Sequence, residues 1–193
     1  AHMVIHPEDI RYHLEKALYM AATGRPGPVW LDLPLDVQGA IIETESLRAY
    51  DPAENPEQRP QEILQETIEK ILDKIEESHR PVLSPGNGVR LAGAIEEFHE
   101  LVDVLGVPVV TGMSSVDALE SDHPYFVGRS GGTGTRPGNF ALQNSDVLLS
   151  IGNRQGFAQT GFQYQDWARE SYTILNDIDE NELIGFVVKN AQK

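Results

Sequence analysis

A glycine-rich stretch in the second half of this chain has the residue types that could hold a phosphate group. Residues 128–139 contain five glycines and two arginines. Backbone amides of such a loop can surround an anion while a guanidinium group neutralises its charge. The stretch therefore predicts a phosphate-binding loop, with contacts from Gly131, Gly132 and Gly134 and a charge supplied by Arg129 or Arg136. The competing interpretation is a connecting loop that binds no ligand.

A second glycine turn, Gly86-Asn87-Gly88, directly follows a short apolar run at residues 81–84. Glycines at such a turn let backbone amides approach a phosphate at the start of a helix, where the helix dipole favours an anion. The spacing differs from the dinucleotide fingerprint G-x-G-x-x-G, because the next glycine is Gly93. An ordinary tight turn between a strand and a helix explains the same residues.

Arg154 is the strongest single candidate for a nucleotide contact. It follows an apolar run at residues 146–151 and a glycine, Gly152. If this run is a strand of a parallel sheet, its carboxyl end presents Arg154 to the crevice where such sheets bind ligands. Arginine suits a diphosphate because its forked N–H donors match the oxygens of an anion.

The remaining reactive residue types form no catalytic or metal-binding pattern. The chain has no cysteine, which excludes disulfides and thiolate nucleophiles. No serine has the context of a nucleophile elbow. His2 is set aside because residues 1–3 look like a remnant of cloning. The other histidines have no i, i+4 metal pair among them and no partner carboxylate in register, and they are His6, His13, His79, His99 and His123. We therefore predict no catalytic residue and no metal site within this chain.

Short apolar runs alternate with amphipathic helical patterns over the last two thirds of the chain. Each run ends near a glycine or an aspartate, which favours a turn into the next element. Strands that are apolar on both faces and separated by helices are typical of a parallel sheet covered on both sides. The sequence therefore predicts an open, doubly wound α/β fold with helices on both faces. The expected strands are residues 81–84, 107–111, 146–151 and 173–178.

The chain divides into a short N-terminal part and this α/β domain. Residues 1–3 look like a remnant of cloning, and residues 5–23 show helical spacing of apolar side chains. The run at residues 29–33 lies between a Gly/Pro-rich turn and a proline, which favours a short strand. Proline, glutamate and glutamine are frequent after it. We expect the tail of a truncated domain at residues 4–38, a linker at 39–60 and the α/β domain at 61–193.

The charge of the chain limits its partners. The formal net charge is −15 at pH 7, whereas nucleic acids and anionic membranes attract basic surfaces. No apolar run of about eighteen residues is present, so we expect a cytoplasmic protein that binds neither. The sign reverses locally, because residues 61–106 hold ten acidic and four basic residues while residues 123–169 hold four arginines and two aspartates. Two explanations stay open for this reversal. The region holds a site for an anion, or the difference is chance variation between the two residue ranges compared.

Two segments of the chain resemble thiamine diphosphate (ThDP) enzymes of the acetolactate synthase and pyruvate oxidase group. Residues 24–38, Gly-Arg-Pro-Gly-Pro-Val-Trp-Leu-Asp-Leu-Pro-Leu-Asp-Val-Gln, are similar to the end of the pyrimidine-binding domain of that family. The sequence from about residue 80 onward resembles the family's central domain, including the strand Ser-Asp-Val-Leu-Leu-Ser-Ile-Gly at residues 145–152. The resemblance implies a central domain of the DHS-like NAD/FAD-binding type.

The same resemblance implies residues that contact a nucleotide. In flavin-binding members an arginine just after this strand contacts the dinucleotide, and the matching residue here is Arg154. Asp177 and Asp179 resemble the acidic strand end beside the adenosine, so FAD or ADP is the expected ligand. Flavin-dependent members often continue Phe-Asp-Asp-Arg, whereas this chain has Gln-Gly-Phe-Ala at residues 155–158. This departure leaves open another nucleotide or none.

The parts that carry ThDP chemistry in the family are absent from this sequence. The family's catalytic glutamate would precede residue 1 and its Gly-Asp-Gly magnesium motif would follow residue 193. ThDP and Mg²⁺ are therefore expected in a parent enzyme, a lyase or transferase that decarboxylates a 2-keto acid, and not in this stretch. The implied function is a non-catalytic central domain, inactive alone, that links the two ThDP domains. The alternatives are an NAD-binding enzyme domain with a similar sheet and a structural spacer.

The expected partners follow from the resemblance. They are the missing pyrimidine- and diphosphate-binding domains and further copies of the same chain. Apolar residues of the N-terminal part, Leu14, Leu18, Val29 and Leu31, are expected to face the absent part of a pyrimidine-binding domain. Because uncovered apolar surface invites association, we expect this segment either to be disordered or to be buried in an oligomer.

Overall fold

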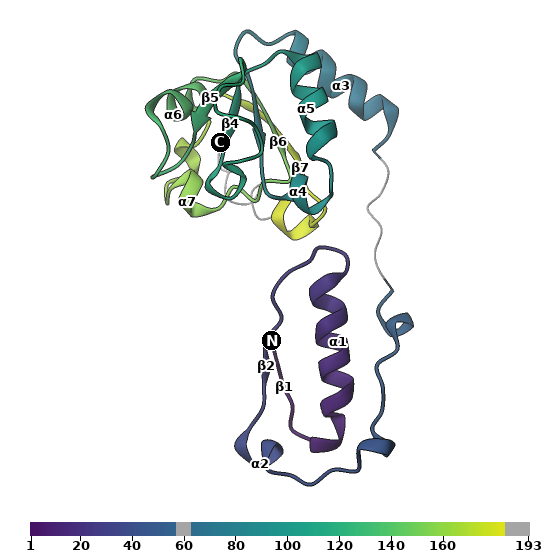
Figure 1. The fold of residues 1–193 in the computed structure, drawn as a ribbon. Coiled ribbons are helices and arrows are strands. Elements are labelled where there is room, and N and C mark those ends of the chain that lie inside the picture. Colours follow the sequence, from purple (N-terminus) through teal and green to yellow (C-terminus); the bar gives the residue numbers. More distant parts are fainter. Residues whose placement is uncertain (57–62, 184–193) are drawn as a thin grey trace. The chain divides into compact units, whose positions relative to one another are not determined.

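The computed structural model describes residues 1–56 and 63–183, which fall into two compact units. The N-terminal unit is Ala1–Gln61 and the C-terminal unit is Glu62–Lys193. Figure 1 shows both units. Residues 57–60 of the predicted linker and the first two residues of the predicted α/β domain lie outside the described residues.

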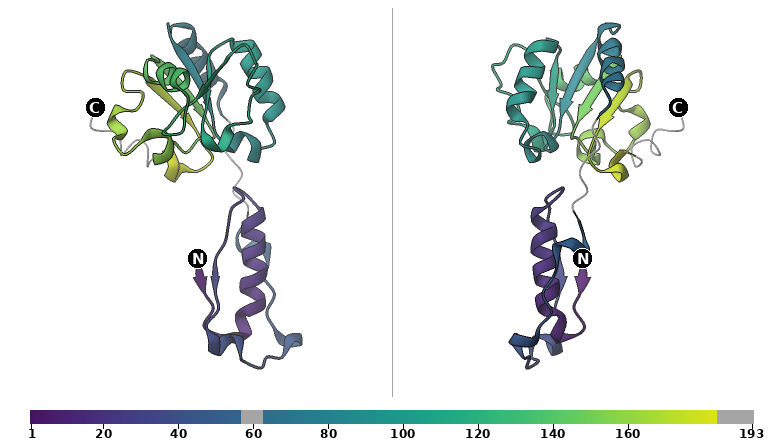
Figure 2. Two further views of the ribbon diagram at one scale, coloured as in Figure 1. Left: turned by 60° about the vertical axis from the view of Figure 1, so that its left-hand side comes forward. Right: turned by 90° about the vertical axis from the view of Figure 1, so that its right-hand side faces the viewer.

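The C-terminal unit contains a five-stranded parallel sheet in the order β5-β4-β3-β6-β7. The chain enters at the central strand β3, winds outward to β4 and β5, and then crosses back to β6 and β7 on the other side (Figures 1 and 2). The strands are β3 (Pro81–Pro85), β4 (Val109–Thr111), β5 (Phe126–Arg129), β6 (Val147–Ile151) and β7 (Tyr172–Asn176). This is the predicted doubly wound topology.

Helices cover both faces of this sheet. Successive residues of a strand point to opposite faces, so each face has its own set of apolar side chains that a helix can bury. On one face, Leu83 and Val109 pack with α3 (Gln65–Glu76), α4 (Gly88–Leu91) and α5 (Ile95–Leu105). On the other face, Val82 and Leu148 pack with α6 (Arg136–Gln143) and with Trp167. The prediction of a parallel sheet with helices on both faces is therefore confirmed.

Three details of this unit differ from the sequence prediction. The strand β5 was not expected, because its apolar run is short and passes into the glycine-rich stretch at Gly128. The single helix expected after Gly88 is divided into α4 and α5, since Gly93 adopts a left-handed φ of 70° that a helix cannot continue through. The helix α6 begins at Arg136, so the last third of the glycine-rich stretch, residues 136–139, is helical.

The remaining short elements connect these layers. A four-residue helix, α7 (Phe157–Thr160), follows β6. Single 3₁₀ turns lie at Met113–Ser115 and Tyr164–Asp166 in this unit, and at Pro7–Asp9, Thr44–Ser46 and Pro52–Glu54 in the N-terminal unit. Within the residues that the structure describes, no helix is both long enough and apolar enough to cross a membrane.

The N-terminal unit consists of one long helix beside two very short strands. The helix α1 (Ile10–Ala22) lies within the predicted residues 5–23. The strand β2 (Leu31–Asp32) lies within the predicted run at residues 29–33 and pairs in parallel with β1 (His2–Met3). A further short helix, α2 (Leu35–Gln38), follows Pro34. His2 and Met3, two of the three residues interpreted as a cloning remnant, thus take part in the strand pairing.

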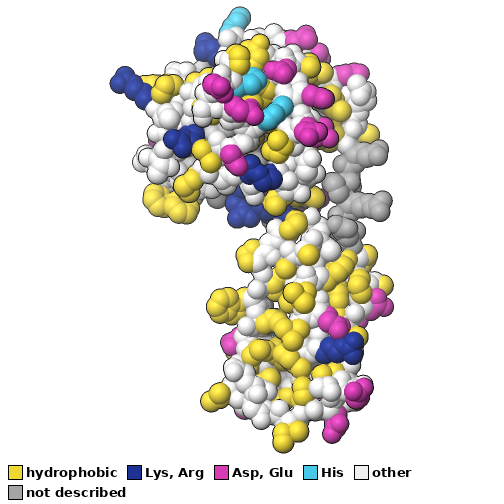
Figure 3. Space-filling view, viewed as in Figure 1, with side chains coloured by type: hydrophobic (Ala, Val, Ile, Leu, Met, Phe, Trp, Pro, Cys, Tyr) yellow, Lys and Arg dark blue, Asp and Glu magenta, His cyan; other side chains and the backbone are white. Residues whose placement is uncertain are grey.

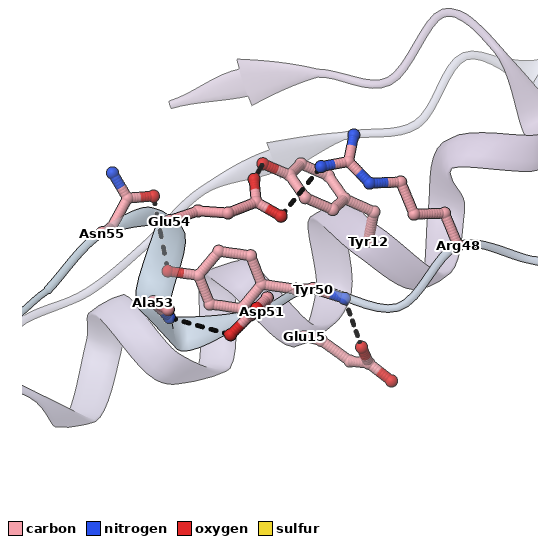
Figure 4. Close-up of polar contacts among 8 residues, drawn as sticks. All are labelled: Tyr12, Glu15, Arg48, Tyr50, Asp51, Ala53, Glu54 and Asn55. Atoms are coloured by element: carbon pink, nitrogen blue, oxygen red, sulfur yellow. Dashed lines mark hydrogen bonds and ion pairs between the residues drawn. The ribbon is translucent and has the colours of Figure 1, made fainter.

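Polar contacts hold the segment before residue 56 against α1 (Figure 4). The Glu54 carboxylate accepts hydrogen bonds from the Tyr12 hydroxyl at 2.9 Å and from the Arg48 guanidinium at 2.8 Å. The Tyr50 backbone amide donates to the Glu15 carboxylate at 2.8 Å. The Tyr50 ring centroid lies 5.6 Å from that of Tyr12. Part of the predicted linker is therefore packed on the helix.

Large apolar side chains remain exposed on the N-terminal unit. Among its described residues only Val4, Val37 and Tyr50 are buried apolar residues. Leu18 is 72% exposed and Ile41 is 99% exposed, and Figure 3 shows hydrophobic side chains gathered on the visible face of this unit. Leu14 and Val29 are exposed as well. What covers this surface stays a prediction.

Candidate nucleotide site at the carboxyl ends of the strands

The two central strands define the place where a parallel sheet of this topology binds ligands. The winding direction reverses between β3 and β6, whose residues pair without a shift from Pro81 and Val147 to Pro85 and Ile151. Their carboxyl ends lead into Gly86-Asn87-Gly88 and into Gly152-Asn153-Arg154. The crevice outside such a reversal point is the usual ligand site of open α/β sheets.

Close backbone packing explains the glycines at this point. The Gly86 amide donates to the Ile151 carbonyl at 2.8 Å, and the Gly88 amide donates to the Gly152 carbonyl at 2.9 Å. A Cβ atom added at Gly88 would lie 2.7 Å from the Gly152 Cα atom, and one at Gly86 would overlap the Gly152 carbonyl oxygen. These two amides are therefore already bonded within the protein. The Asn87 side chain accepts a hydrogen bond from Arg90 at 3.1 Å.

The glycine-rich loop after β5 is also bonded internally. The Gly131 amide donates to the Asn139 side chain at 2.9 Å, and the Gly134 amide donates to the Gly131 carbonyl at 2.9 Å. The Gly132 amide donates to the Ala158 carbonyl at 3.3 Å. Since β5 is an edge strand and two strands separate it from β6, this loop does not line the pocket that contains Arg154.

Arg136 lies at the first position of α6 and is exposed. Its guanidinium carbon is 5.2 Å from the centroid of the Phe140 ring, within the range of a cation–π contact. The structure therefore places Arg136 on the helix surface and does not bring it together with Arg154.

Arg154 and Asp177 line one small polar pocket between the carboxyl ends of β6 and β7. The pocket encloses about 10 Å³, which is room for about one water molecule. Arg154 also forms an ion pair with Glu182, with 2.6 Å between Nε and Oε1. The full lining is Asn153, Arg154, Gln155, Leu175, Asn176, Asp177, Glu182 and Leu183.

The two aspartates after β7 organise the turn that follows. The Asp177 carboxylate accepts a hydrogen bond from the Asp179 amide at 3.0 Å. The Asp179 carboxylate accepts from the Asn181 amide at 3.0 Å, and the Asp179 carbonyl accepts from the Glu182 amide at 3.0 Å. Asp177 lines the pocket and Asp179 does not. The contacts of Asp179 therefore fix the turn that carries Glu182.

Of the pocket residues that sequence reasoning did not single out, Glu182 and Gln155 make side-chain contacts within the site. Glu182 was missed because its approach to Arg154 depends on the turn after β7, which no local pattern encodes. Gln155 is 2% exposed and adopts a left-handed φ of 53°. Its side-chain nitrogen donates to the Ser150 hydroxyl at 2.7 Å, while its side-chain oxygen has no partner among the described residues. Gln155 lies three residues after Gly152, in the polar segment that follows β6, and this position is the one signal that could have suggested it.

Residues 1–56 and 63–183 contain no clustering of acidic and histidine side chains of the kind that holds a metal ion. Within that part of the chain, no three His, Asp or Glu side chains converge on a point where they could hold a metal ion. The sequence also has no Gly-Asp dipeptide. The pocket at Arg154 has neither a histidine nor a lysine in its lining, and its charged side chains are Arg154, Asp177 and Glu182.

A larger pocket of about 300 Å³ lies at the opposite, amino end of the sheet. Its lining is formed by His79, Arg80, Pro81, Val82, Pro108, Ala141 and Asn144. None of the residues predicted to contact a nucleotide lies there. Because ligands of parallel sheets bind at the carboxyl ends of the strands, the smaller pocket is the candidate site.

The C-terminal unit matches a known protein family. Residues 68–189 match the family model described as the thiamine pyrophosphate enzyme, central domain. The chain belongs to this family. The resemblance to ThDP (thiamine pyrophosphate) enzymes is therefore confirmed, and the sheet with the Arg154 pocket is its central domain.

Curated relatives of the chain are acetolactate synthase large subunits. It is 37% identical over 92% of its length to a probable acetolactate synthase large subunit of Methanocaldococcus jannaschii. It is 36% identical over 94% of its length to the acetolactate synthase large subunit of Corynebacterium glutamicum. It is 32% identical over 94% of its length to the acetolactate synthase isozyme 1 large subunit of Escherichia coli. The matches span 30%, 28% and 31% of these relatives, so the chain corresponds to less than a third of each.

Proposed function

We propose that this chain acts as the non-catalytic central part of a longer ThDP-dependent enzyme resembling acetolactate synthase. The family match and the names of the relatives support this proposal. In the longer protein, other domains would hold ThDP and Mg²⁺ and would decarboxylate a 2-keto acid before joining it to an acceptor. The central domain would link those domains and form a wall of the substrate channel.

The N-terminal unit would then pack against the rest of a pyrimidine-binding domain. Its exposed apolar residues support this role, because a unit with so few buried side chains has little to stabilise it alone. Further copies of the protein are the other expected partner. The expected location of the whole enzyme is the cytoplasm.

We further propose that the central domain holds FAD or ADP at the carboxyl ends of β6 and β7. The observation that carries this proposal is that Arg154 and Asp177, from neighbouring strands, line the same pocket. Arg154 would pair with the diphosphate, and Asp177 would accept hydrogen bonds from ribose hydroxyls. Because the pocket encloses only about 10 Å³, the nucleotide would lie across its rim, where the Arg154 side chain is 61% exposed.

Calorimetric titration of the chain with ADP and with FAD tests this role. Arg154→Ala should weaken binding by about tenfold or more, the loss expected when a charged hydrogen bond is removed. Arg80→Ala removes the same charge at the opposite end of the sheet and should leave the affinity within about twofold. If Arg136→Ala abolishes binding while Arg154→Ala does not, the phosphate is held by the loop after β5.

A structural spacer that binds no nucleotide is the second candidate. The specific observation that favours it is that the glycine amides of both turns are already bonded within the protein. If calorimetry detects no heat of binding with ADP, FAD or NAD at millimolar concentration, the result establishes this second function and rejects the first.

A further inference from the structure

The guanidinium group proposed to meet a phosphate is already paired with an acid from its own chain. Arg154 Nε lies 2.6 Å from Glu182 Oε1. The Glu182 side chain is 23% exposed, whereas Arg154 is 61% exposed. The carboxylate thus lies on the inner side of the pair, where the pocket also contains Asp177.

The turn after β7 sets the position of this carboxylate. The Asp179 side chain accepts hydrogen bonds from the Asn181 amide and the Asn181 side chain, at 3.0 and 3.1 Å. The Asp179 carbonyl accepts from the Glu182 amide at 3.0 Å. Glu182 is therefore presented to Arg154 by a bonded turn and does not reach it by chance from a distant loop.

The pocket consequently has an unfavourable charge for a phosphate. Its lining contains one cation, Arg154, and two acids, Asp177 and Glu182. A diphosphate must compete with the Glu182 carboxylate for the same forked N–H donors and is also repelled by it. A nucleoside without phosphate meets neither obstacle, because its hydroxyl groups can donate to Asp177.

We infer that Glu182 is a specificity-determining residue that competes with the phosphate for Arg154 and so disfavours nucleoside diphosphates relative to nucleosides. This inference rests on the proposed nucleotide site. When a diphosphate binds, Arg154 exchanges one anionic partner for another and Glu182 turns toward solvent. No covalent step is involved, and the charge on Glu182 sets the selectivity.

The test is a calorimetric comparison of ADP and adenosine binding to the unmodified chain and to Glu182→Gln. The amide keeps the size of the side chain but removes its charge, so ADP should bind about fivefold more tightly while adenosine changes by less than about twofold. Glu180→Gln is the matched control, because Glu180 is an exposed acid in the same turn. It should leave both affinities unchanged. Glu182→Ala, checked by circular dichroism, should repeat the effect of Glu182→Gln.

The outcomes separate this inference from the proposed site. Binding of ADP to both proteins, with the higher affinity in Glu182→Gln, supports both. An equal gain with Glu180→Gln, or an equal gain for adenosine, overturns the inference, since the effect would then be general electrostatics. Unchanged ADP affinity in Glu182→Gln also overturns it while the site stands. If neither protein binds ADP or adenosine at millimolar concentration, both the site and the inference are rejected.

Discussion

The two units of this chain start from similar local patterns but bury their apolar residues to very different degrees. Each contains an amphipathic helix beside a short apolar strand. In the C-terminal unit, helices on both faces of a five-stranded sheet enclose two apolar clusters. In the N-terminal unit, β1 and β2 have two residues each, and three apolar residues are buried among those described.

This difference shows that a local pattern forms a stable unit only when a second layer covers it. Both faces of the sheet have such a layer, so Leu148 and Val110 are fully enclosed. The helix α1 is covered only in part, by two strands of two residues each and by the segment held by Glu54 and Tyr50 (Figure 4). Stability should therefore come mainly from the C-terminal unit, and matched substitutions in the two units can test this.

The largest contrast is expected for leucine truncation. Leu148→Ala leaves a cavity in the enclosed cluster and should lower the free energy of unfolding by about 3–4 kcal/mol. Leu18→Ala removes a side chain that is already exposed and should change it by less than about 0.5 kcal/mol. Urea titration followed by circular dichroism measures both values. Similar losses in the two variants would contradict the contrast.

Glycine substitution should give the next largest effect. Gly88→Ala places a Cβ atom 2.7 Å from backbone at Gly152 and should cost about 2–3 kcal/mol of unfolding free energy. Gly27→Ala in the N-terminal unit brings its Cβ no closer than 4.0 Å to the Arg25 carbonyl oxygen. Thermal denaturation should show a lower midpoint for Gly88→Ala alone. An unchanged midpoint in that variant would mean that the two turns can separate without cost.

A smaller effect is expected at Asp146, whose carboxylate joins the entries of β6 and β3. Burial raises its pKa, but hydrogen bonds from the Ser78 hydroxyl and the His79 and Arg80 amides outweigh this and lower the pKa from 3.8 to about 2. A lowered pKa stabilises the fold above pH 4, and the contribution is lost as the pH falls from about 4 to 2. Asp146→Asn should therefore cost about 1–2 kcal/mol at pH 7.

The measurement is urea unfolding at pH 7 and at pH 3. The difference between Asp146→Asn and the unmodified chain should shrink at the lower pH. Glu54→Gln, which removes a carboxylate of the N-terminal unit, should not move the main transition at either pH. A difference for Asp146→Asn that stays constant with pH would show that the carboxylate charge is not the source of its effect.

Much of this fold follows from local patterns. Apolar runs with helical segments between them indicate a parallel sheet, and Arg154 could be assigned to a strand end for the same reason. Asp177 is assigned through the resemblance to ThDP enzymes. The strand β5 could not, because Phe126 and Val127 are followed at once by Gly128 and the run is too short to stand out. Its pairing with β4 is a tertiary contact.

The contacts within the site were beyond local reasoning. Glycine turns that could cradle a phosphate are also the turns that let two backbones touch, and only the packing of Gly86 against Gly152 separates these uses. The pairing of Arg154 with Glu182 likewise depends on how the turn after β7 folds. The residue types therefore suggested where a ligand could bind. The contacts that these residues already make within the protein could be found only from the structure.

Hydrogen exchange measured by mass spectrometry on the whole chain tests the central difference between the two units most directly. Amides of β3 and β6 should exchange slowly, near the rate set by global unfolding, because they lie between two covered faces. Amides of β1, β2 and α1 should exchange much faster, through local opening of a unit with little buried surface. Equally slow exchange in both units would contradict the account, since it would show that the N-terminal unit is as stable as the sheet.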